Sequence, residues 1–122
     1  MGSRKGWLQK GSAMLRIENE IVVMVGRVHG LARVVARRDK DLANQMKRSA
    51  TSVGLNTAEG LWARKGNRTA RLETAMCSGR ETLMALRIAG AAGYLENELA
   101  TRQAKQLDRI VGTLHKLTYR KR

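Results

Sequence analysis

The sequence predicts an all-α fold, an antiparallel up-down-up-down four-helix bundle, and two observations carry this prediction. The 122 residues include no proline, no phenylalanine and only two tryptophans and two tyrosines. A β-protein of this size would need more aromatic and β-branched residues, with turn residues at short intervals. Instead, four segments repeat apolar residues at spacings of three and four, which is the period of a helix with a buried face. The length suits one core, so we expect one domain.

The first helix should run from about Met14 to Arg38. Residues 1–13 are rich in Gly and Lys and lack a signal-peptide core, so we expect a flexible basic tail there. The apolar stripe of the helix consists of Ile17, Ile21, Met24, Val28, Leu31 and Val35. Val22 and Val23 lie outside this stripe, and a helix that is apolar nearly all round is buried on more than one side. We therefore predict that both valines contact another subunit.

The second helix should begin after Asp39, a good N-cap, and run to about Ala63. Its inner face is made mostly of small residues, which let a neighbouring helix approach closely: Leu42, Met46, Ser49, Ala50, Val53, Thr57 and Gly60. A polar stripe follows its flank and consists of Gln45, Arg48, Ser52, Asn56 and Glu59. Because an unpaired buried charge is very costly, we interpret this stripe as structural, with Arg48 or another arginine pairing with Glu59 or Glu81 in a buried network.

Gly66 and Asn67 interrupt the helical pattern and predict a turn. The third helix should then start near Asn67 or Thr69 and run to about Ala92, with Gly93 as its stop. Its inner face consists of Leu72, Ala75, Met76, Gly79, Leu83, Leu86, Gly90 and Gly93.

The fourth helix should run from about Glu96 to Thr118. Its inner face consists of Leu99, Gln103, Leu107, Ile110, Leu114 and Leu117. Residues 119–122 form a basic C-terminal tail, so the bundle spans residues 14–118. Short connections between long helices make sequence neighbours antiparallel.

Enzyme motifs are absent, so we expect no catalysis, no cofactor and no metal. His29 and His115 lie on different helices without a metal-ligand spacing, and the di-iron ExxH motif is missing. The single Cys77 allows no internal disulfide, fits a reducing compartment and is more typical of an inert core residue than of a nucleophile. No apolar run is long enough to span a bilayer. We therefore expect a cytoplasmic protein.

The charge is the strongest functional signal. Lys and Arg number 24 against 10 Asp and Glu, a net charge of +14, and most of the cations are arginine. Self-repulsion at this charge costs stability unless an anionic partner offsets it. Nucleic acid, RNA or DNA, is the usual partner, and an acidic membrane surface is the next candidate. A basic surface that serves only solubility is the alternative.

The fourth helix carries the clearest basic pattern. Its stripe comprises Arg102, Lys105, Arg109, Lys116 and Arg120, and the chain ends with Lys121 and Arg122. At about 100° per residue, the five helical cations fall within about 60° of one another and away from the inner face. A solvated face would normally mix signs, whereas only Asp108 interrupts this one, so we predict a nucleic-acid-binding surface here. Secondary clusters are Arg37, Arg38 and Lys40 at one corner, and Arg64, Lys65 and Arg68 at the next.

Two segments resemble the bacterial four-helix-bundle family that includes the 23S rRNA intervening-sequence proteins. In the second helix, the residues in step with the family signature are Gln45, Met46, Lys47, Arg48, Ser49, Ser52, Val53, Asn56, Ala58, Glu59 and Gly60. The stretch Glu81 to Leu95 is similar to the family's third helix and its Gly-Tyr-Leu exit. Departures are the entry to the third helix at 75–78, Leu83 in place of a glutamate, and a missing proline near Gly54 or Leu55.

The resemblance implies a four-helix protomer that assembles as a ring-shaped homopentamer without catalysis. The family also includes proteins similar to the accessory variability determinants of diversity-generating retroelements, which are basic pentamers that bind a reverse transcriptase and nucleic acid. The net charge of +14 favours this group and makes a reverse transcriptase a candidate partner. The alternative is an intervening-sequence protein that acts as a protein-interaction scaffold without binding nucleic acid.

Overall fold

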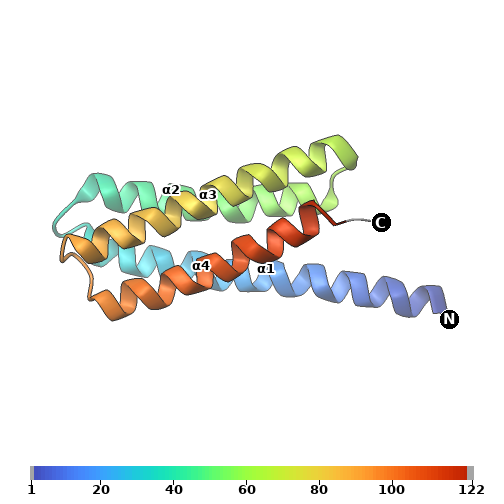
Figure 1. Cartoon of the computed structure of the whole chain (residues 1–122), viewed down its shortest axis with the longest axis horizontal. Coiled ribbons are helices and arrows are strands. Elements are labelled where there is room, and N and C mark those ends of the chain that lie inside the picture. The colour runs from blue at the N-terminus through green and yellow to red at the C-terminus, as the bar shows by residue number, and fades with distance from the viewer. Residues whose placement is uncertain (1, 121–122) are drawn as a thin grey trace.

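The computed structural model describes the backbone of residues 2–120 and the side chains of residues 14–64 and 66–120. In this part of the chain there are four helices and no strand: α1 (Gly2–Val35), α2 (Lys40–Trp62), α3 (Lys65–Ala91) and α4 (Asn97–Thr118). They alternate in direction, so the α1–α2 and α3–α4 corners lie at one end of the molecule and the α2–α3 corner lies at the other (Figure 1). The all-α, four-helix prediction is confirmed.

Each helix packs mainly against its neighbours in sequence, and α4 returns to contact α1 through the smallest of these interfaces. The core lies between the helices and consists largely of the stripes that the sequence predicted. Ile21, Met24, Met46, Leu86 and Leu107 are among its fully enclosed side chains. The up-down-up-down order therefore follows from short connections and one apolar face per helix.

The bounds of α1 differ from the predicted Met14 to Arg38. The helix begins at Gly2, so the backbone of residues 2–13, expected as a tail, continues the helix. That segment has no proline, and isolated glycines weaken a helix without ending it. At the other end α1 stops at Val35, because residues 36–38 form a turn in which Asp39 N–H still reaches the Val35 carbonyl, 2.8 Å away.

Asp39 caps α2 as predicted: its side chain accepts a 2.9 Å hydrogen bond from the Leu42 backbone N–H. The turn predicted at Gly66 and Asn67 is wrong, because α3 begins at Lys65 and both residues lie in its first turn. The first N–H groups of any helix lack intrahelical partners, so this position tolerates residues that would weaken a helix interior.

Gly93 ends α3 as predicted and adopts a positive φ of 78°. Its N–H bonds the Gly90 carbonyl at 3.1 Å, and the Tyr94 N–H bonds the Ala89 carbonyl at 2.9 Å. This pair of bonds is a Schellman motif, whose left-handed residue is normally glycine because a Cβ would be strained there. The motif turns the chain so that α4 can run back along α3.

Leu99 and Thr82 are two of the residues that differ from the expected core. Leu99, placed on the inner face of α4, is 40% exposed. Thr82, which the apolar pattern omitted, is fully buried and bonds Ser49 across the α2–α3 interface at 2.7 Å. A short hydroxyl side chain can enter a close helix–helix contact when its hydrogen bond is satisfied there.

Candidate nucleic-acid interface

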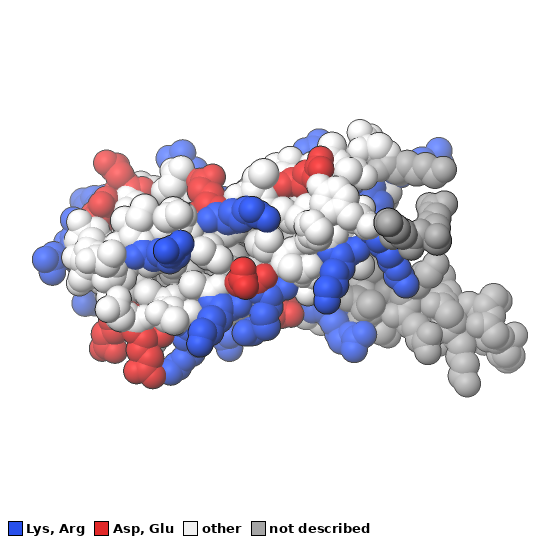
Figure 2. All heavy atoms as spheres, viewed as in Figure 1, with Lys and Arg blue, Asp and Glu red and all other residues white. Residues whose placement is uncertain are grey.

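The first half of the predicted α4 stripe lines a groove between α1 and α4. Arg102, Lys105 and Arg109 come from α4, and Arg27 comes from α1. The groove has a volume of about 520 Å³. Figure 2 shows basic side chains gathered along the edge where α4 lies beside α1. Sequence reasoning missed Arg27, because only the fold brings this isolated arginine opposite α4.

Two buried glutamines lie at the α4 side of the groove. Gln103 and Gln106 are each 6% exposed. The Gln106 Oε1 accepts a 2.6 Å hydrogen bond from Gln103 Nε2 and a longer one, 3.4 Å, from Arg27 Nη1. The Gln106 amide therefore ties the Arg27 guanidinium to α4 and holds a cation at the rim of the groove.

No acidic side chain among the described residues lines this groove. Glu98 forms an ion pair of 3.1 Å with Arg102, but the two side chains are 80% and 71% exposed, and such surface pairs contribute little. Asp108, which interrupts the basic stripe in sequence, lines a different groove, between α3 and α4. All charged side chains that line the α1–α4 groove are therefore cations.

The remaining stripe residues lie farther along α4. Lys116 and Arg120 are exposed beyond Arg109, toward the C-terminal end of the helix and its exit. Lys121 and Arg122 lie outside the described residues. The basic stripe thus continues past the groove, but its second half does not line it.

The two corner clusters lie at opposite ends of the molecule, so they form no single competing site (Figure 1). The 23 residues of α2 separate them, which corresponds to roughly 35 Å at 1.5 Å per residue. At the α1–α2 corner, Arg37 and Lys40 are exposed, and Arg38 lies over the Tyr94 ring, 5.9 Å from its centroid.

At the α2–α3 corner Arg64 is exposed, whereas Arg68 donates a 3.3 Å hydrogen bond to the Leu61 carbonyl. That bond satisfies one of the free carbonyls at the C-terminal end of α2. The side chain of Lys65 lies outside the described residues. Arg68 therefore has a structural partner that the groove cations Lys105 and Arg109 lack among the described residues.

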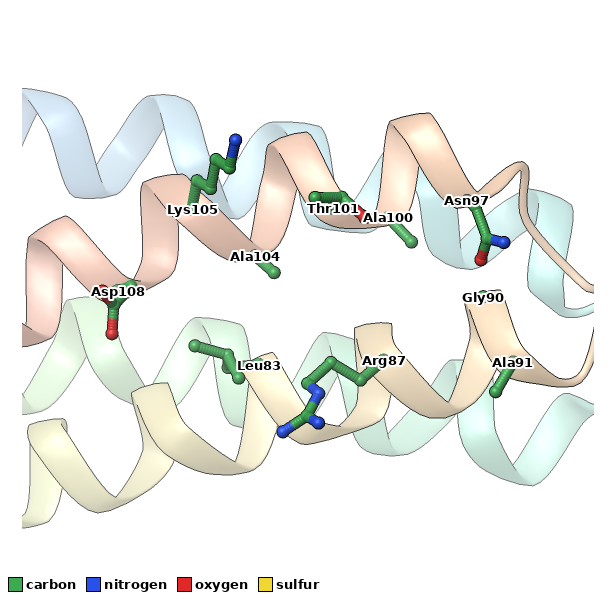
Figure 3. Close-up of a pocket in the computed structure, with 10 residues that line it drawn as sticks. All are labelled: Leu83, Arg87, Gly90, Ala91, Asn97, Ala100, Thr101, Ala104, Lys105 and Asp108. Atoms are coloured by element: carbon green, nitrogen blue, oxygen red, sulfur yellow. The ribbon is translucent and has the colours of Figure 1, made fainter.

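The groove between α3 and α4 has a different character (Figure 3). Its walls carry mostly small side chains, namely Gly90, Ala91, Ala100, Thr101 and Ala104, together with Leu83. In Figure 3 Lys105 extends away from α3 and Arg87 extends away from α4, while Asp108 points toward α3. An anion in this groove would meet a carboxylate and no inward-pointing cation.

An apolar groove lies on the other side of α1, against α2. Val22, Val25 and Leu55 line it together with Glu18, and its volume is about 340 Å³. Val22 is 67% and Leu55 63% exposed, an unusual exposure for two neighbouring aliphatic side chains. Val23 is exposed but does not line this groove, so the two predicted interface valines do not share one surface.

The polar network on α2 differs from the predicted buried pairing. Gln45 Nε2 donates to Glu81 at 2.9 Å on the surface, and Glu59 pairs with Arg71 at 3.1 Å, more than half exposed. Arg48 is exposed and forms no ion pair within the described residues. These charges stay hydrated, so the sequence argument from the cost of burial did not apply to them.

The hydrogen bonds between side chains of α2 and α3 that are at least partly buried involve hydroxyl groups instead. Ser52 Oγ lies 2.7 Å from Ser78 Oγ, and Asn56 Nδ2 donates to the Ser52 hydroxyl and carbonyl at 3.0 Å each. The Ser49–Thr82 pair lies one turn away. Asn56 thus bonds a serine, while the predicted pairing of an arginine with Glu59 forms at the surface, through Arg71.

The remaining reactive side chains do not converge on a site. Cys77 is exposed, contrary to the expected core position, because it lies one residue past the buried Met76 on α3. His29 lies 3.1 Å from the Thr51 hydroxyl. Within the described side chains, no three His, Cys, Asp or Glu residues lie close enough to hold a metal ion. None of the described helices is long and apolar enough to cross a membrane.

Tyr119, just after α4, donates a hydrogen bond to the Glu73 carboxylate of α3. This bond, with the negative charge of Glu73, raises the pKa of the Tyr119 phenol above its ordinary value of 10.0. The His115 ring packs edge-on against Tyr119, with centroids 4.8 Å apart. These contacts fix the C-terminal end of α4 to α3.

Comparison with known proteins agrees with this architecture. The family model of the 23S rRNA-intervening sequence proteins matches residues 15–116. A crystal structure of a protein of unknown function from the S23 ribosomal protein family of Bacteroides thetaiotaomicron superposes with a TM-score of 0.79 at 20% identity. The alignment covers 84% of this chain and 98% of that chain. No curated protein matches this sequence.

Proposed function

Because this chain belongs to the 23S rRNA-intervening sequence protein family, we propose that it is a non-enzymatic, basic, oligomeric protein that binds RNA or DNA. The observation that supports this proposal is the α1–α4 groove, where four cations from two helices surround a space without an acidic lining residue. Arginine suits phosphate because its planar guanidinium makes two parallel hydrogen bonds to an anion.

The overall charge points in the same direction. A net charge of +14 on 13.6 kDa attracts polyanions to the whole surface. The groove concentrates four of the cations at one site. The exposed ion pair of Arg102 with Glu98 would exchange for a phosphate at little cost, because surface pairs are weak. Phosphate groups that enter the groove would therefore replace water at these cations.

We also propose a homo-oligomer, with the ring-shaped pentamer as the leading arrangement. The support is the apolar groove between α1 and α2 with its exposed Val22 and Leu55. Assembly through this groove would remove these side chains from contact with water. Several copies of the α1–α4 groove would then act together on one nucleic-acid chain, and avidity would raise the apparent affinity. A reverse transcriptase is a candidate partner, on the grounds of the basic charge together with the resemblance to the retroelement accessory proteins.

The alternative function is a protein-interaction scaffold without nucleic-acid binding. The exposed apolar surface of α1 and α2 favours it, since that surface would serve protein contacts whether or not nucleic acid binds. In that case the basic groove would face an acidic protein surface.

Fluorescence anisotropy with labelled RNA and DNA, single-stranded and duplex, tests the proposal. We expect binding at low salt with a linear fall of log affinity against log salt, because each phosphate contact releases counterions. A slope that corresponds to several contacts supports the nucleic-acid function. An absence of binding to every form at about 50 mM salt would favour the scaffold.

A further inference from the structure

We propose that the α1–α4 groove holds one unpaired nucleotide of a single-stranded nucleic acid, with its phosphate among Arg27, Lys105 and Arg109. This inference rests on the proposed nucleic-acid function and assigns the form of the ligand and its orientation. The groove differs in chemistry from one end to the other, and this difference assigns the end that holds the phosphate.

The antiparallel packing of α1 and α4 sets this polarity. Arg27 contacts Gln106, so residues later in α1 lie toward the beginning of α4. Leu31 of α1 and Leu99 of α4 therefore line the same end of the groove, while Arg27 and Arg109 line the other. Arg102 also lies at the leucine end, where Glu98 pairs with it at 3.1 Å. An end with two leucines and one ion-paired cation, and an end whose cations form no ion pair among the described residues, match the two halves of a nucleotide, namely its base with the sugar and its phosphate.

The buried glutamines add polar groups between those ends. Gln103 Nε2 and Gln106 Oε1 bond each other at 2.6 Å, which leaves the Gln106 Nε2 donor and the Gln103 Oε1 acceptor without partners among the described residues. Both side chains are 6% exposed and line the groove, so these two atoms stay open to it, and a ligand group that enters the groove can replace water at them. A sugar hydroxyl or a base edge supplies both a donor and an acceptor.

The width of the groove selects the unpaired strand. The groove is a surface depression between two helices whose axes, when packed, lie about 8–10 Å apart, whereas a duplex is wider than its own major groove of roughly 12 Å. A duplex can therefore only lie across the rim and meet the outermost cations. A single strand can lower one nucleotide between the helices, where its base leaves the stack and contacts Leu31 and Leu99.

Gly30 is a position at which a substitution can test this inference. It lines the groove, and a Cβ built at this glycine has no heavy atom within 4 Å. A side chain at this position therefore begins in open space, and a leucine would extend into the groove and leave every charge unchanged. Gly26, one turn earlier on α1, also has open space around its Cβ but does not line the groove, so Gly26→Leu is the matched control.

Anisotropy with a short single strand and with a duplex of the same length tests the inference. We expect Gly30→Leu to weaken single-strand binding by about tenfold or more, and to leave duplex binding and the Gly26→Leu control near the parent value. Single-strand affinity in Gly30→Leu equal to that of the parent would overturn the nucleotide site while the nucleic-acid function stands. A parent protein that binds neither ligand would overturn both.

A second variant covers the case in which Gly30→Leu does not fold, as judged by circular dichroism. Leu99 is already 40% exposed, so Leu99→Ala should leave the core intact. It should weaken binding of the single strand several-fold and leave binding of inorganic polyphosphate unchanged, because polyphosphate has no base. Equal loss for both ligands, or no loss for either, would replace the nucleotide site with a plain anion site.

Discussion

Thr82 on α3 donates a hydrogen bond of 2.7 Å to Ser49 on α2, and both side chains are buried in the α2–α3 interface. Thr82 Oγ1 also lies 2.8 Å from the Ser78 carbonyl, and Ser49 Oγ lies 3.3 Å from that of Met46. The pair replaces the buried arginine–glutamate network that the sequence suggested.

Thr82→Val keeps the shape of the side chain and removes the hydroxyl, whose single proton is shared between Ser49 Oγ and the Ser78 carbonyl, so it should lower the free energy of unfolding by about 1 kcal/mol. Ser49→Ala should cost less, because the Thr82 hydroxyl can then donate its proton fully to the Ser78 carbonyl. Urea denaturation measures both. Thr74→Val is the control, since Thr74 makes the same kind of bond to the Ala70 carbonyl on the exposed side of α3. A larger loss for Ser49→Ala would contradict this account.

Gly79→Ala should destabilise the protein by about 1–3 kcal/mol through overpacking. A Cβ at Gly79 would lie 2.7 Å from Cγ2 of Val111 on α4, and a helical valine has essentially one rotamer with which to respond. Gly26→Ala is the opposite case: with open space around it, it should stabilise α1 by roughly 0.5–1 kcal/mol. Thermal melts that rank the variants in the reverse order would refute the close approach at Gly79.

Sedimentation equilibrium should find the parent protein as an oligomer at tens of micromolar. Val22→Glu should shift it toward the protomer with unchanged helicity, because this side chain lines the apolar groove and is exposed in the single chain. Val34→Glu is the control, since Val34 is exposed on α1 without lining that groove. A parent that sediments as a monomer would sink the assembly proposal.

Removal of single cations from the α1–α4 groove should change the salt dependence of binding. Arg27→Ala and Arg109→Ala should each lower the slope of log affinity against log salt by roughly one unit. Arg80→Ala removes an exposed arginine of α3 that lines none of the described grooves and should change the slope less. The two corners need separate variants: full loss of binding on neutralising Arg37, Arg38 and Lys40, with the groove variants normal, would move the site to that corner.

The phenol of Tyr119 should titrate above pH 10.0, because its hydrogen bond to Glu73 raises the pKa. A pKa raised in the folded state gives stability that is fully present below the unfolded pKa, near 10, and is lost as the pH rises through the folded pKa. Absorbance titration of the parent minus Tyr119→Phe isolates this group. Glu73→Gln should return its midpoint toward the ordinary value, and an unchanged midpoint would exclude Glu73 as the cause.

The helices were predictable from the sequence because period, capping and stop signals are local. Asp39 and Gly93 act within a few residues, and the structure confirms both. The predicted turn at Gly66 and Asn67 failed because it rested on the same local signals. Both residues have a low helix propensity in a helix interior, but here they lie in the first turn of α3, where low propensity costs little stability.

The candidate site was predictable only in part. The α4 face of the groove follows from spacing along one helix, so Arg102, Lys105 and Arg109 were found. Arg27 is separated from Gln106 by 79 positions, and its place opposite α4 depends on the rotation of α1 in the bundle. The separation of the corner cations was predictable, because successive corners of an up-down-up-down bundle lie at opposite ends of the molecule.

The small interface between α1 and α4 has a kinetic consequence. It is the one helix pairing that joins the two ends of the chain, whereas the other pairings close over short connections. Distant contacts carry the larger loop-closure entropy, so this pairing should form last during folding and open first during unfolding. Mutations in it should then change mainly the unfolding rate. A nucleic acid held across this interface would slow unfolding, and stopped-flow unfolding in its presence would report occupancy of the groove as a longer lifetime of the native state.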